Sequence, residues 1–214
     1  MPAVLFIDLW PEVAKPGYWK KRFLAVPAAA SQAGFAATPH HFTRLDAAHL
    51  SATPPAGIIL SGSRSNLVEN HAADPRNGVT LAAFAALTEL LVRLPQVPVL
   101  GICFGMQYLT VAAGGALARL PANRQDPVWP IEVLGKDPLF TGIARPRCVE
   151  NHSWQVARPA PGYRVIARSS DGIEGIRHER LPRAGVQFHP EYHRQPGATA
   201  HGELLLMNWL GGLA

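Results

Sequence analysis

Apolar residues gather in short continuous runs along this chain, and helix-like segments separate them. Three of these runs indicate buried strands: Ala3–Asp8, Gly57–Ser61 and the run that begins at Val97. Strands that are apolar on both faces are typical of a parallel sheet with helices on each side. We therefore predict an α/β fold with a mostly parallel central sheet flanked by helices.

The segments between the runs carry helix signals. Trp19–Gln32 is predicted to be a helix that ends at Gly34, and Val79–Leu94, rich in Ala and Leu, is the most helix-like part of the chain. The remaining predictions are helices at Leu45–Leu50, Met106–Ala113 and His201–Leu210, and a peripheral strand at Phe35–His41 that contains Pro39.

The pattern changes between Ala116 and Arg168 to short strands and proline-rich loops, which predicts a small β-rich addition to the main sheet. Beyond it, Ile173–His178 and Gly185–His189 are predicted to pair around a turn at Leu181–Pro182. Leu9–Tyr18 and Asn70–Gly78 are rich in turn residues and are predicted to be loops. A chain of 214 residues is most simply one domain, residues 1–214.

Composition narrows the class of protein. The chain is 48% hydrophobic and 16% charged, and no apolar run reaches the roughly 18 residues of a membrane helix. The net charge of +5 is scattered along the chain without a nucleic-acid motif, so neither nucleic acid nor a membrane is an expected partner. The N-terminus begins directly as a core strand, and only two cysteines are present. We therefore expect a cytoplasmic protein without disulfides.

One cysteine stands where a buried strand is predicted to turn into a helix, in Gly-Ile-Cys-Phe-Gly at 101–105. This order is the cysteine form of the nucleophile elbow, in which a strained turn holds the reactive side chain above the sheet. The glycines allow strand and helix to approach closely, and the start of the helix favours a thiolate. Cys103 is therefore the predicted nucleophile, and Cys148, which lacks such a turn, is predicted to be structural.

A histidine and a carboxylate stand two residues apart in Gly-Val-Gln-Phe-His-Pro-Glu at 185–191. We predict a strand that ends at Pro190, where a ladder donor is lost. The period of two then places His189 and Glu191 on the same side. Glu191 would orient the imidazole of His189, and His189 would act as the base for Cys103.

These two blocks together resemble the paired signature of the class I glutamine amidotransferases. Gly57–Gly62 (Gly-Ile-Ile-Leu-Ser-Gly) resembles the family's third block, and the three blocks occur in the family's order over nearly the whole chain. The resemblance implies a flavodoxin-like α/β sandwich and a glutaminase that forms a thioester on Cys103, releasing glutamate and ammonia. It also implies L-glutamine as the substrate, no cofactor, and a separate ammonia-accepting synthetase subunit. Within the family, the motifs look closest to the glutaminase part of GMP synthetase, while Ser63-Arg64 and the long loop after Asp8 fit an orphan member equally well, so the ammonia acceptor stays open.

By the same resemblance, the oxyanion hole uses the backbone N–H groups of Phe104 and of the residue after Gly62. Here the chain departs from the family, because Gly-Ser-Arg at 62–64 replaces the usual Gly-Gly-Pro. A positive φ at Ser63 would cost roughly 1–2 kcal/mol relative to glycine. Whether the hole is preformed therefore stays open.

The resemblance also implies residues for substrate binding. Gln107 matches the position whose amide contacts the amino-acid end of the substrate. Asn151–Trp154 (Asn-His-Ser-Trp) resembles the family's His-Ser segment, so that His152 and Ser153 would hold the same end. Trp154 would either cap the glutamine pocket or pack in the core.

Two other functions stay open at this point. The same triad could serve a γ-glutamyl hydrolase or transferase acting on a γ-glutamyl amine or peptide, and a non-catalytic regulatory subunit is a further alternative. No metal site is expected, since the adjacent His40 and His41 would face opposite sides of a strand. The sequence also has no phosphate-binding loop of the Walker type.

Overall fold

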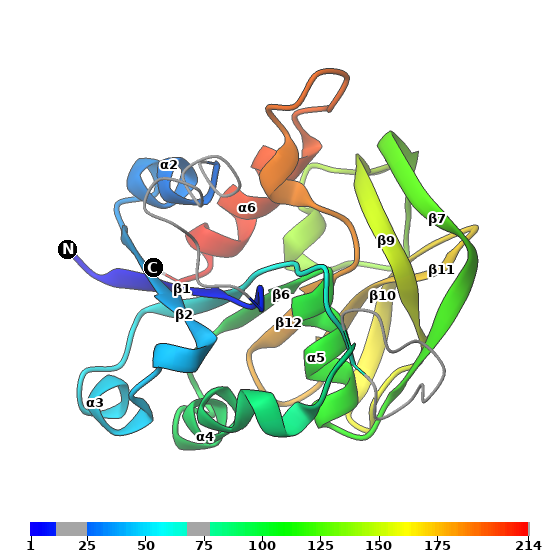
Figure 1. Cartoon of the computed structure of the whole chain (residues 1–214). Helices are drawn as coiled ribbons and strands as arrows, with labels where there is room; N and C mark the ends of the chain where they lie inside the picture. The colour runs from blue at the N-terminus through cyan, green and yellow to red at the C-terminus, as the bar shows by residue number, and fades with distance from the viewer. Residues whose placement is uncertain (12–24, 68–77, 214) are drawn as a thin grey trace.

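The structure is a computed structural model that describes residues 1–11, 25–67 and 78–213. Its centre is a sheet in which five neighbouring strands run parallel (Figure 1). In spatial order these strands are β2 (Ala36–His41), β1 (Ala3–Asp8), β3 (Gly57–Leu60), β6 (Val99–Ile102) and β12 (Arg183–Val186). The prediction of a mostly parallel sheet is confirmed, and β2, the strand that contains Pro39, lies at its edge.

Helices cover both faces of this sheet (Figure 1). One face carries α2 (Ala25–Gln32) and α6 (His201–Gly211), and the other carries α3 (Ala47–Ala52), α4 (Ala85–Arg93) and α5 (Phe104–Ala112). Because side chains alternate along a strand, β1 contributes Val4 and Phe6 to one core and Leu5 and Ile7 to the other. The apolar runs of the sequence are therefore strands that are buried on both faces.

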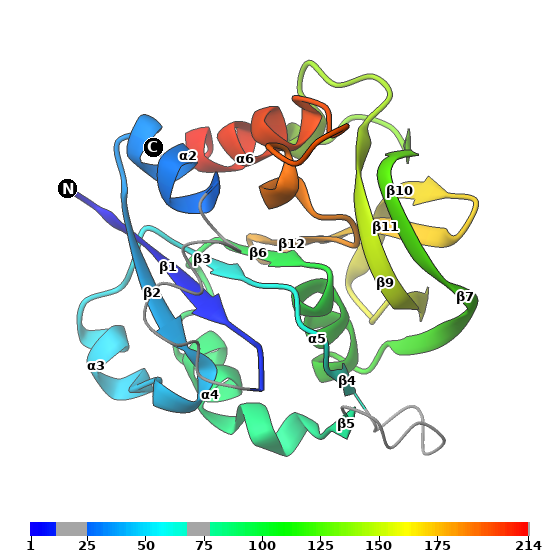
Figure 2. The same ribbon diagram turned by 45° about the horizontal axis from the view of Figure 1, so that its top comes forward.

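The β-rich addition is a set of antiparallel strands beside the parallel sheet (Figure 2). The long pair β7 (Ala116–Pro130) and β9 (Arg147–Arg158) forms its outer part, with β10 (Tyr163–Ser169), β11 (Gly172–His178) and the short β8 (Glu132–Val133). The pairing of β11 with β12 joins this addition to the main sheet, as predicted.

Two predicted helices begin later in the structure than in the prediction. Val79 belongs to the short strand β5 (Gly78–Val79), which pairs with β4 (Asn66–Leu67), and a 3-10 helix, η3 (Leu81–Phe84), precedes α4. The start of α3 is set by Asp46, whose side chain accepts a hydrogen bond from the backbone N–H of His49 at 2.9 Å. The starts of these two helices are therefore set by strand pairing and by a helix cap, and the apolar pattern alone placed them too early.

The predicted strand at Gly185–His189 is too long. β12 ends at Val186, His189 makes only an isolated bridge to Val149, and Pro190 begins the 3-10 helix η5 (Pro190–Tyr192). Two other short 3-10 helices are η1 (Phe42–Arg44) and η4 (Pro138–Phe140). Residues 19–24 of the first predicted helix, and most of the two predicted loops at 9–18 and 70–78, lie outside the described residues.

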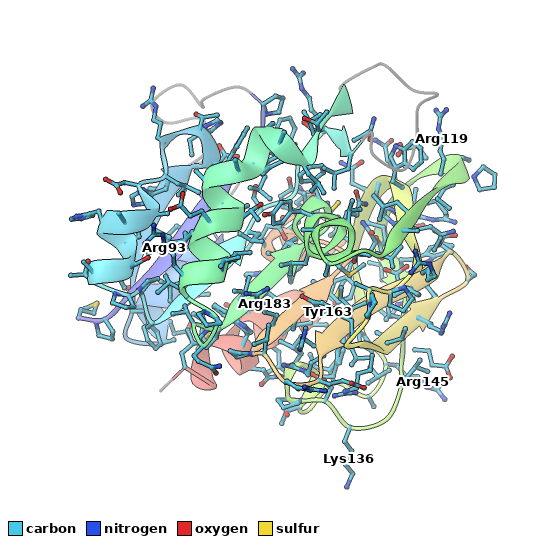
Figure 3. The ribbon with its side chains drawn as sticks, turned by 90° about the horizontal axis from the view of Figure 1, so that it is seen from below. Arg93, Arg119, Lys136, Arg145, Tyr163 and Arg183 are labelled. Carbon is cyan, nitrogen blue, oxygen red and sulfur yellow. The ribbon has the colours of Figure 1, made fainter. Side chains whose placement is uncertain are left out.

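Basic side chains are spread over the molecule. Arg93, Arg119, Lys136 and Arg145 are exposed: Arg93 is on α4, Arg119 is on β7, and Lys136 and Arg145 lie in the connection between β8 and β9 (Figure 3). Arg183 makes a hydrogen bond within the protein, in which its guanidinium donates to the carbonyl of Leu91 at 2.7 Å. The basic residues Lys15, Lys20, Lys21 and Arg22 lie outside the described part of the chain. Among the helices that the structure describes, none has the length and apolar character needed to cross a bilayer.

Candidate active site

Cys103 stands at a strained turn between β6 and α5, as predicted. Its φ of 50° makes it the only non-glycine residue with a positive φ in the described ranges. A Cβ on Gly101 would lie 2.6 Å from the backbone of Gly105, and a Cβ on Gly105 would lie 2.6 Å from the carbonyl oxygen of Leu60. Both positions therefore require glycine, since strand and helix touch there. The N–H of Cys103 donates to the carbonyl of Val186 at 2.7 Å, which ties the turn to β12.

His189 lies beside this turn and is held by Glu191. The Nδ1 atom of His189 is 2.7 Å from Oε1 of Glu191, and both side chains are buried. Burial by itself lowers the pKa of His189, yet the Glu191 carboxylate and the neighbouring Cys103 sulfur raise it well above its usual value. The pair comes from the 3-10 turn at Pro190 rather than from one side of a strand. The ring of His189 also stacks on Tyr192, with 4.7 Å between ring centroids.

The segment after β3 forms the opposite wall. The hydroxyl of Ser61 donates to the carbonyl of Gly62 at 2.7 Å and accepts from the N–H of Leu9 at 2.9 Å. The N–H and C=O of one trans peptide point in opposite directions, so this bond also fixes the direction of the Ser63 N–H. Ser63 has no positive φ, and the strain considered for it from the sequence does not arise. Phe104 is the first residue of α5, where N–H groups have no partner within the helix.

A cavity of about 210 Å³ lies between these segments. Every residue predicted for the site except Phe104 lines it, namely Gly62, Ser63, Cys103, Gln107, His152, Ser153, Trp154, His189 and Glu191. Typical cofactor and drug sites have roughly 300–1,000 Å³, so the size suits a small molecule such as an amino acid. The sequence did not single out Trp10, Asn123 and Tyr192, which also line the cavity but stand in no motif.

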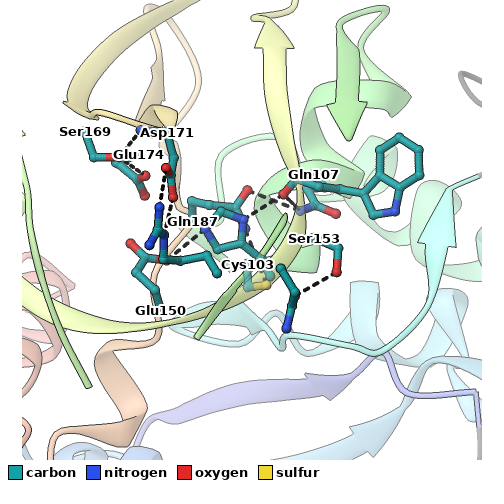
Figure 4. Close-up of polar contacts among 12 residues, drawn as sticks. Cys103, Gln107, Glu150, Ser153, Ser169, Asp171, Glu174 and Gln187 are labelled. Atoms are coloured by element: carbon teal, nitrogen blue, oxygen red, sulfur yellow. Dashed lines mark hydrogen bonds and ion pairs between the residues drawn. The ribbon is translucent and has the colours of Figure 1, made fainter. Parts of the chain in front are cut away.

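The side chain of Gln107 makes hydrogen bonds within the protein that the sequence did not predict. Its Nε2 atom donates to the backbone carbonyl of Trp154 at 2.8 Å and to Oε1 of Gln187 at 3.2 Å (Figure 4). The Trp154 side chain belongs to the hydrophobic core as well as to the cavity wall, so both of its predicted roles are compatible with its position. The hydroxyl of Ser153 donates to Asn123 at 2.7 Å. Substrate contacts by these residues stay predictions.

A buried group of ionisable side chains includes the cavity-lining His152, and the sequence did not predict this group. Glu150 and His152 on β9 and Glu174 on β11 place one ligand-type atom each within 4.8 Å of the others (Figure 4 shows the two carboxylates). Among the described residues, this is the group whose atom types could hold a metal ion. Glu150 and His152 stand two residues apart on β9, so their side chains lie on the same face of the strand. This spacing is the one feature of the sequence that indicated the group.

We interpret this group as a proton-holding cluster. Burial, together with the neighbouring Glu150, raises the pKa of Glu174 well above its usual value, and burial raises the pKa of Glu150 to about 8. Burial lowers the pKa of His152, whose Nδ1 lies 3.0 Å from the carbonyl of Trp154 and must carry a hydrogen there. The Nε2 atom of His152 lies 3.0 Å from Oε2 of Glu150. With one proton between them, these two atoms would form a hydrogen bond.

The comparison with protein families identifies the chain. A family model described as "Glutamine amidotransferase class-I" matches residues 30–209. The chain belongs to this family. The resemblance carried by the three sequence blocks is thereby confirmed.

Individual relatives agree with this assignment. The chain is 35% identical to one subunit of the glutamine-hydrolyzing GMP synthase of Pyrococcus abyssi over 164 residues, which are 75% of this chain and 77% of that protein. It is 38% identical to "Anthranilate synthase component 2, pyocyanine specific" of Pseudomonas aeruginosa over 124 residues, 56% of this chain and 59% of that protein.

Solved structures support the fold of this class I amidotransferase. A structure from Thermoplasma acidophilum matches with a TM-score of 0.75 at 16% identity and covers 100% of this chain and 94% of its own. A glutamine amidotransferase from Thermotoga maritima matches with a TM-score of 0.63 at 17% identity, over 89% of this chain and 77% of its own. The predicted flavodoxin-like fold class is therefore confirmed.

Proposed function

We propose that this class I amidotransferase hydrolyses the side-chain amide of L-glutamine and passes the ammonia to a separate synthetase subunit. The observation that carries the proposal is the arrangement of three side chains. The sulfur of Cys103 stands on a strained turn and lines the same cavity as His189, and Glu191 holds the imidazole of His189 at 2.7 Å. A nucleophile, a base and an orienting carboxylate are the parts that covalent amide hydrolysis requires.

In the first half of the reaction, the Cys103 thiolate attacks the amide carbon of glutamine and forms a tetrahedral oxyanion. His189 gives its proton to the nitrogen as the C–N bond breaks, so ammonia leaves and a γ-glutamyl thioester remains on the sulfur. In the second half, His189 takes a proton from water, which attacks the thioester. Glutamate is released and Cys103 returns to the thiolate.

The oxyanion would be bound by the backbone N–H groups of Ser63 and Phe104. The fixed direction of the Gly62–Ser63 peptide supports this role, because the Ser61 hydroxyl keeps the Gly62 carbonyl turned toward itself. One such donor is worth about 3–4 kcal/mol of barrier. We also propose that Gln107, His152, Ser153 and Trp154, which line the cavity, form the region that receives the amino-acid end of glutamine.

A separate acceptor is proposed from the relatives, whose names describe one subunit or one component of a synthase. We propose further that the chain forms one domain over residues 1–214. A cytoplasmic location is part of the same proposal, since both cysteines are free thiols and the chemistry requires a reduced sulfur.

Covalent labelling tests the catalytic part of this proposal. The glutamine-like electrophile 6-diazo-5-oxo-norleucine should modify Cys103 and leave Cys148 unmodified, because burial raises the pKa of the Cys148 thiol far above its usual value. Cys103→Ala should abolish both labelling and ammonia release, whereas the matched control Cys148→Ala should keep both. Labelling of Cys148 with retained activity in Cys103→Ala would refute the assignment.

A second measurement separates glutaminase activity from the γ-glutamyl alternatives. The isolated protein is given glutamine or γ-glutamyl amines and peptides, and the release of ammonia or amine is followed. We expect ammonia from glutamine as the main product. Faster release of amine from γ-glutamyl compounds would favour the hydrolase or transferase, and absence of both products together with absence of labelling would favour a regulatory subunit.

Co-purification from the native cell tests the partner. An ammonia-using synthetase subunit should accompany the chain, and adding it should increase glutamine hydrolysis. A chain that purifies alone and hydrolyses glutamine at full rate would contradict this part of the proposal.

A further inference from the structure

The side-chain amide of Gln187 lies against the Cys103 sulfur, and the reaction described above gives it no role. Gln187 directly follows β12, is fully buried, and places its Nε2 atom 3.4 Å from Sγ of Cys103 (Figure 4). Val186 pairs with Ile102 in parallel register, so the residues that follow these two strands stand side by side. The contact is therefore a consequence of the strand register.

The neighbours of the amide fix which of its ends faces the sulfur. Nε2 of Gln107 lies 2.8 Å from the carbonyl oxygen of Trp154, and a carbonyl can only accept, so this atom must be an NH₂ group. The same Nε2 lies 3.2 Å from the Gln187 side chain, which must therefore offer its oxygen there. The remaining end of the Gln187 amide, its NH₂ group, then faces Cys103.

This arrangement is anchored on both sides of the amide. His152 donates from Nδ1 to the carbonyl of Trp154 at 3.0 Å, so that carbonyl is held by two donors. The backbone N–H of Gln187 donates to the carbonyl of Glu174 at 2.9 Å. Gln107 and His152 are buried like Gln187, so bulk water does not compete for these bonds.

We propose that Gln187 is a further catalytic residue whose amide N–H donates to the sulfur of Cys103 and stabilises the thiolate. Gln107 acts as a positioning residue that keeps this N–H turned toward the sulfur. The inference rests on the proposed function, in which Cys103 is the nucleophile. A hydrogen bond to an ionised acceptor is stronger than one to a neutral acceptor, so the contact favours thiolate over thiol.

One other ionisable group, His189, also acts on this sulfur. His189 faces it, with Glu191 behind the imidazole, and the charge of His189 is felt by Glu150 and His152 on β9. Each of these groups is present in every amide variant. A difference between the pH profiles of amide variants therefore reports the amide itself.

The test follows alkylation of Cys103 by iodoacetamide from about pH 5 to about pH 10 in a Cys148→Ala background. Gln187→Met removes the donor and keeps the length of the side chain. Alkylation near pH 6 should become about tenfold slower, with the same limiting rate at high pH, because the thiolate then forms at higher pH. Gln187→Glu places a carboxylate against the sulfur and should slow alkylation near pH 6 by about a hundredfold.

Two further variants complete the design. Gln107→Met leaves the Gln187 amide free to turn and should produce a smaller shift of the profile in the same direction. Thr110→Val is the matched control, because Thr110 is buried on the same helix and its hydroxyl donates to the carbonyl of Met106. Its alkylation profile should coincide with that of the parent.

A profile of Gln187→Met that coincides with the parent overturns the inference, and so does an equal loss of rate at every pH, which would indicate packing alone. If thermal unfolding shows that Gln187→Met is unfolded, Gln107→Met decides the question, because it leaves Gln187 in the chain and removes only the donor that orients its amide. Alkylation needs no glutamine, so the result stands even if the glutaminase proposal fails. Conversely, an active glutaminase with an unchanged profile rejects only the role of Gln187.

Discussion

Gly62→Ala is the substitution whose effect on the site can be worked out most directly from the structure. Gly62 has no positive φ, so alanine strains the site only through its side chain. The new Cβ would lie 2.8 Å from Cε1 of His189, where carbon atoms normally stay about 3.5–4.0 Å apart. The ring would have to move by about 0.7–1.2 Å. Glu191 at 2.7 Å and the stacked Tyr192 oppose this movement.

We expect the displaced imidazole to lower kcat for glutamine hydrolysis by about a hundredfold, which corresponds to about 2.7 kcal/mol of barrier. Overpacking of the buried ring should also lower the free energy of unfolding by about 1–3 kcal/mol. Steady-state release of ammonia measures the first effect, and urea unfolding measures the second.

The matched control is Gly211→Ala, because a Cβ on Gly211 would meet nothing within 4 Å at the end of α6. This variant should keep the activity and stability of the parent. If Gly62→Ala retained full kcat, the imidazole would not depend on its place between Gly62 and Glu191, and the geometric reasoning would be refuted.

Three further substitutions probe the surroundings of the site. Ser61→Ala frees the Gly62 carbonyl to turn, so kcat should fall by about 10- to 100-fold in a steady-state assay with a smaller change in KM. Asp137→Ala removes a buried carboxylate that pairs with two arginines at 2.6 and 2.9 Å, so urea unfolding should show a loss of about 3 kcal/mol with unchanged kcat. Glu150→Gln should make the protein increasingly more stable than the parent as the pH rises. Burial raises the pKa of Glu150 to about 8, so between about pH 4.5 and 8 the unfolded parent loses a proton that the folded parent keeps. The parent therefore loses up to about 1.4 kcal/mol of stability per pH unit in that window, and the non-titrating variant does not.

Two of these substitutions have a matched control. Ser51→Ala removes a hydroxyl that donates within α3 and should leave kcat unchanged. Glu89→Gln, an exposed carboxylate on α4, should show no widening difference from the parent with pH. A constant stability difference for Glu150→Gln between about pH 5 and 8 would argue against proton uptake by this group. A fall in kcat for Asp137→Ala would show that this ion pair shapes the site.

The candidate nucleophile and its base were predictable because their signals are local. A strained turn between touching elements requires glycine on both sides of the bend, and Gly101 and Gly105 record this in the sequence. The buried strands were equally visible, since burial on both faces leaves a continuous apolar run such as Ala3–Asp8. The spacing of His189 and Glu191 also pointed to a pair, although the assumed strand is a 3-10 turn.

Other parts of the site depended on contacts between residues far apart in the chain. Gln187 and Cys103 are 84 residues apart, and their contact exists because β12 lies next to β6 in a particular register. Glu150 stands in a strand that also contains exposed polar residues, and Glu174 stands in one that also contains half-buried polar residues, so nothing in the alternation shows that their sides face inward. Side-chain periodicity specifies the faces of a strand but neither its neighbour nor its register. The sequence alone therefore determined the elements and the strained turn, whereas the tertiary structure decided which polar groups surround the sulfur and which carboxyls are buried.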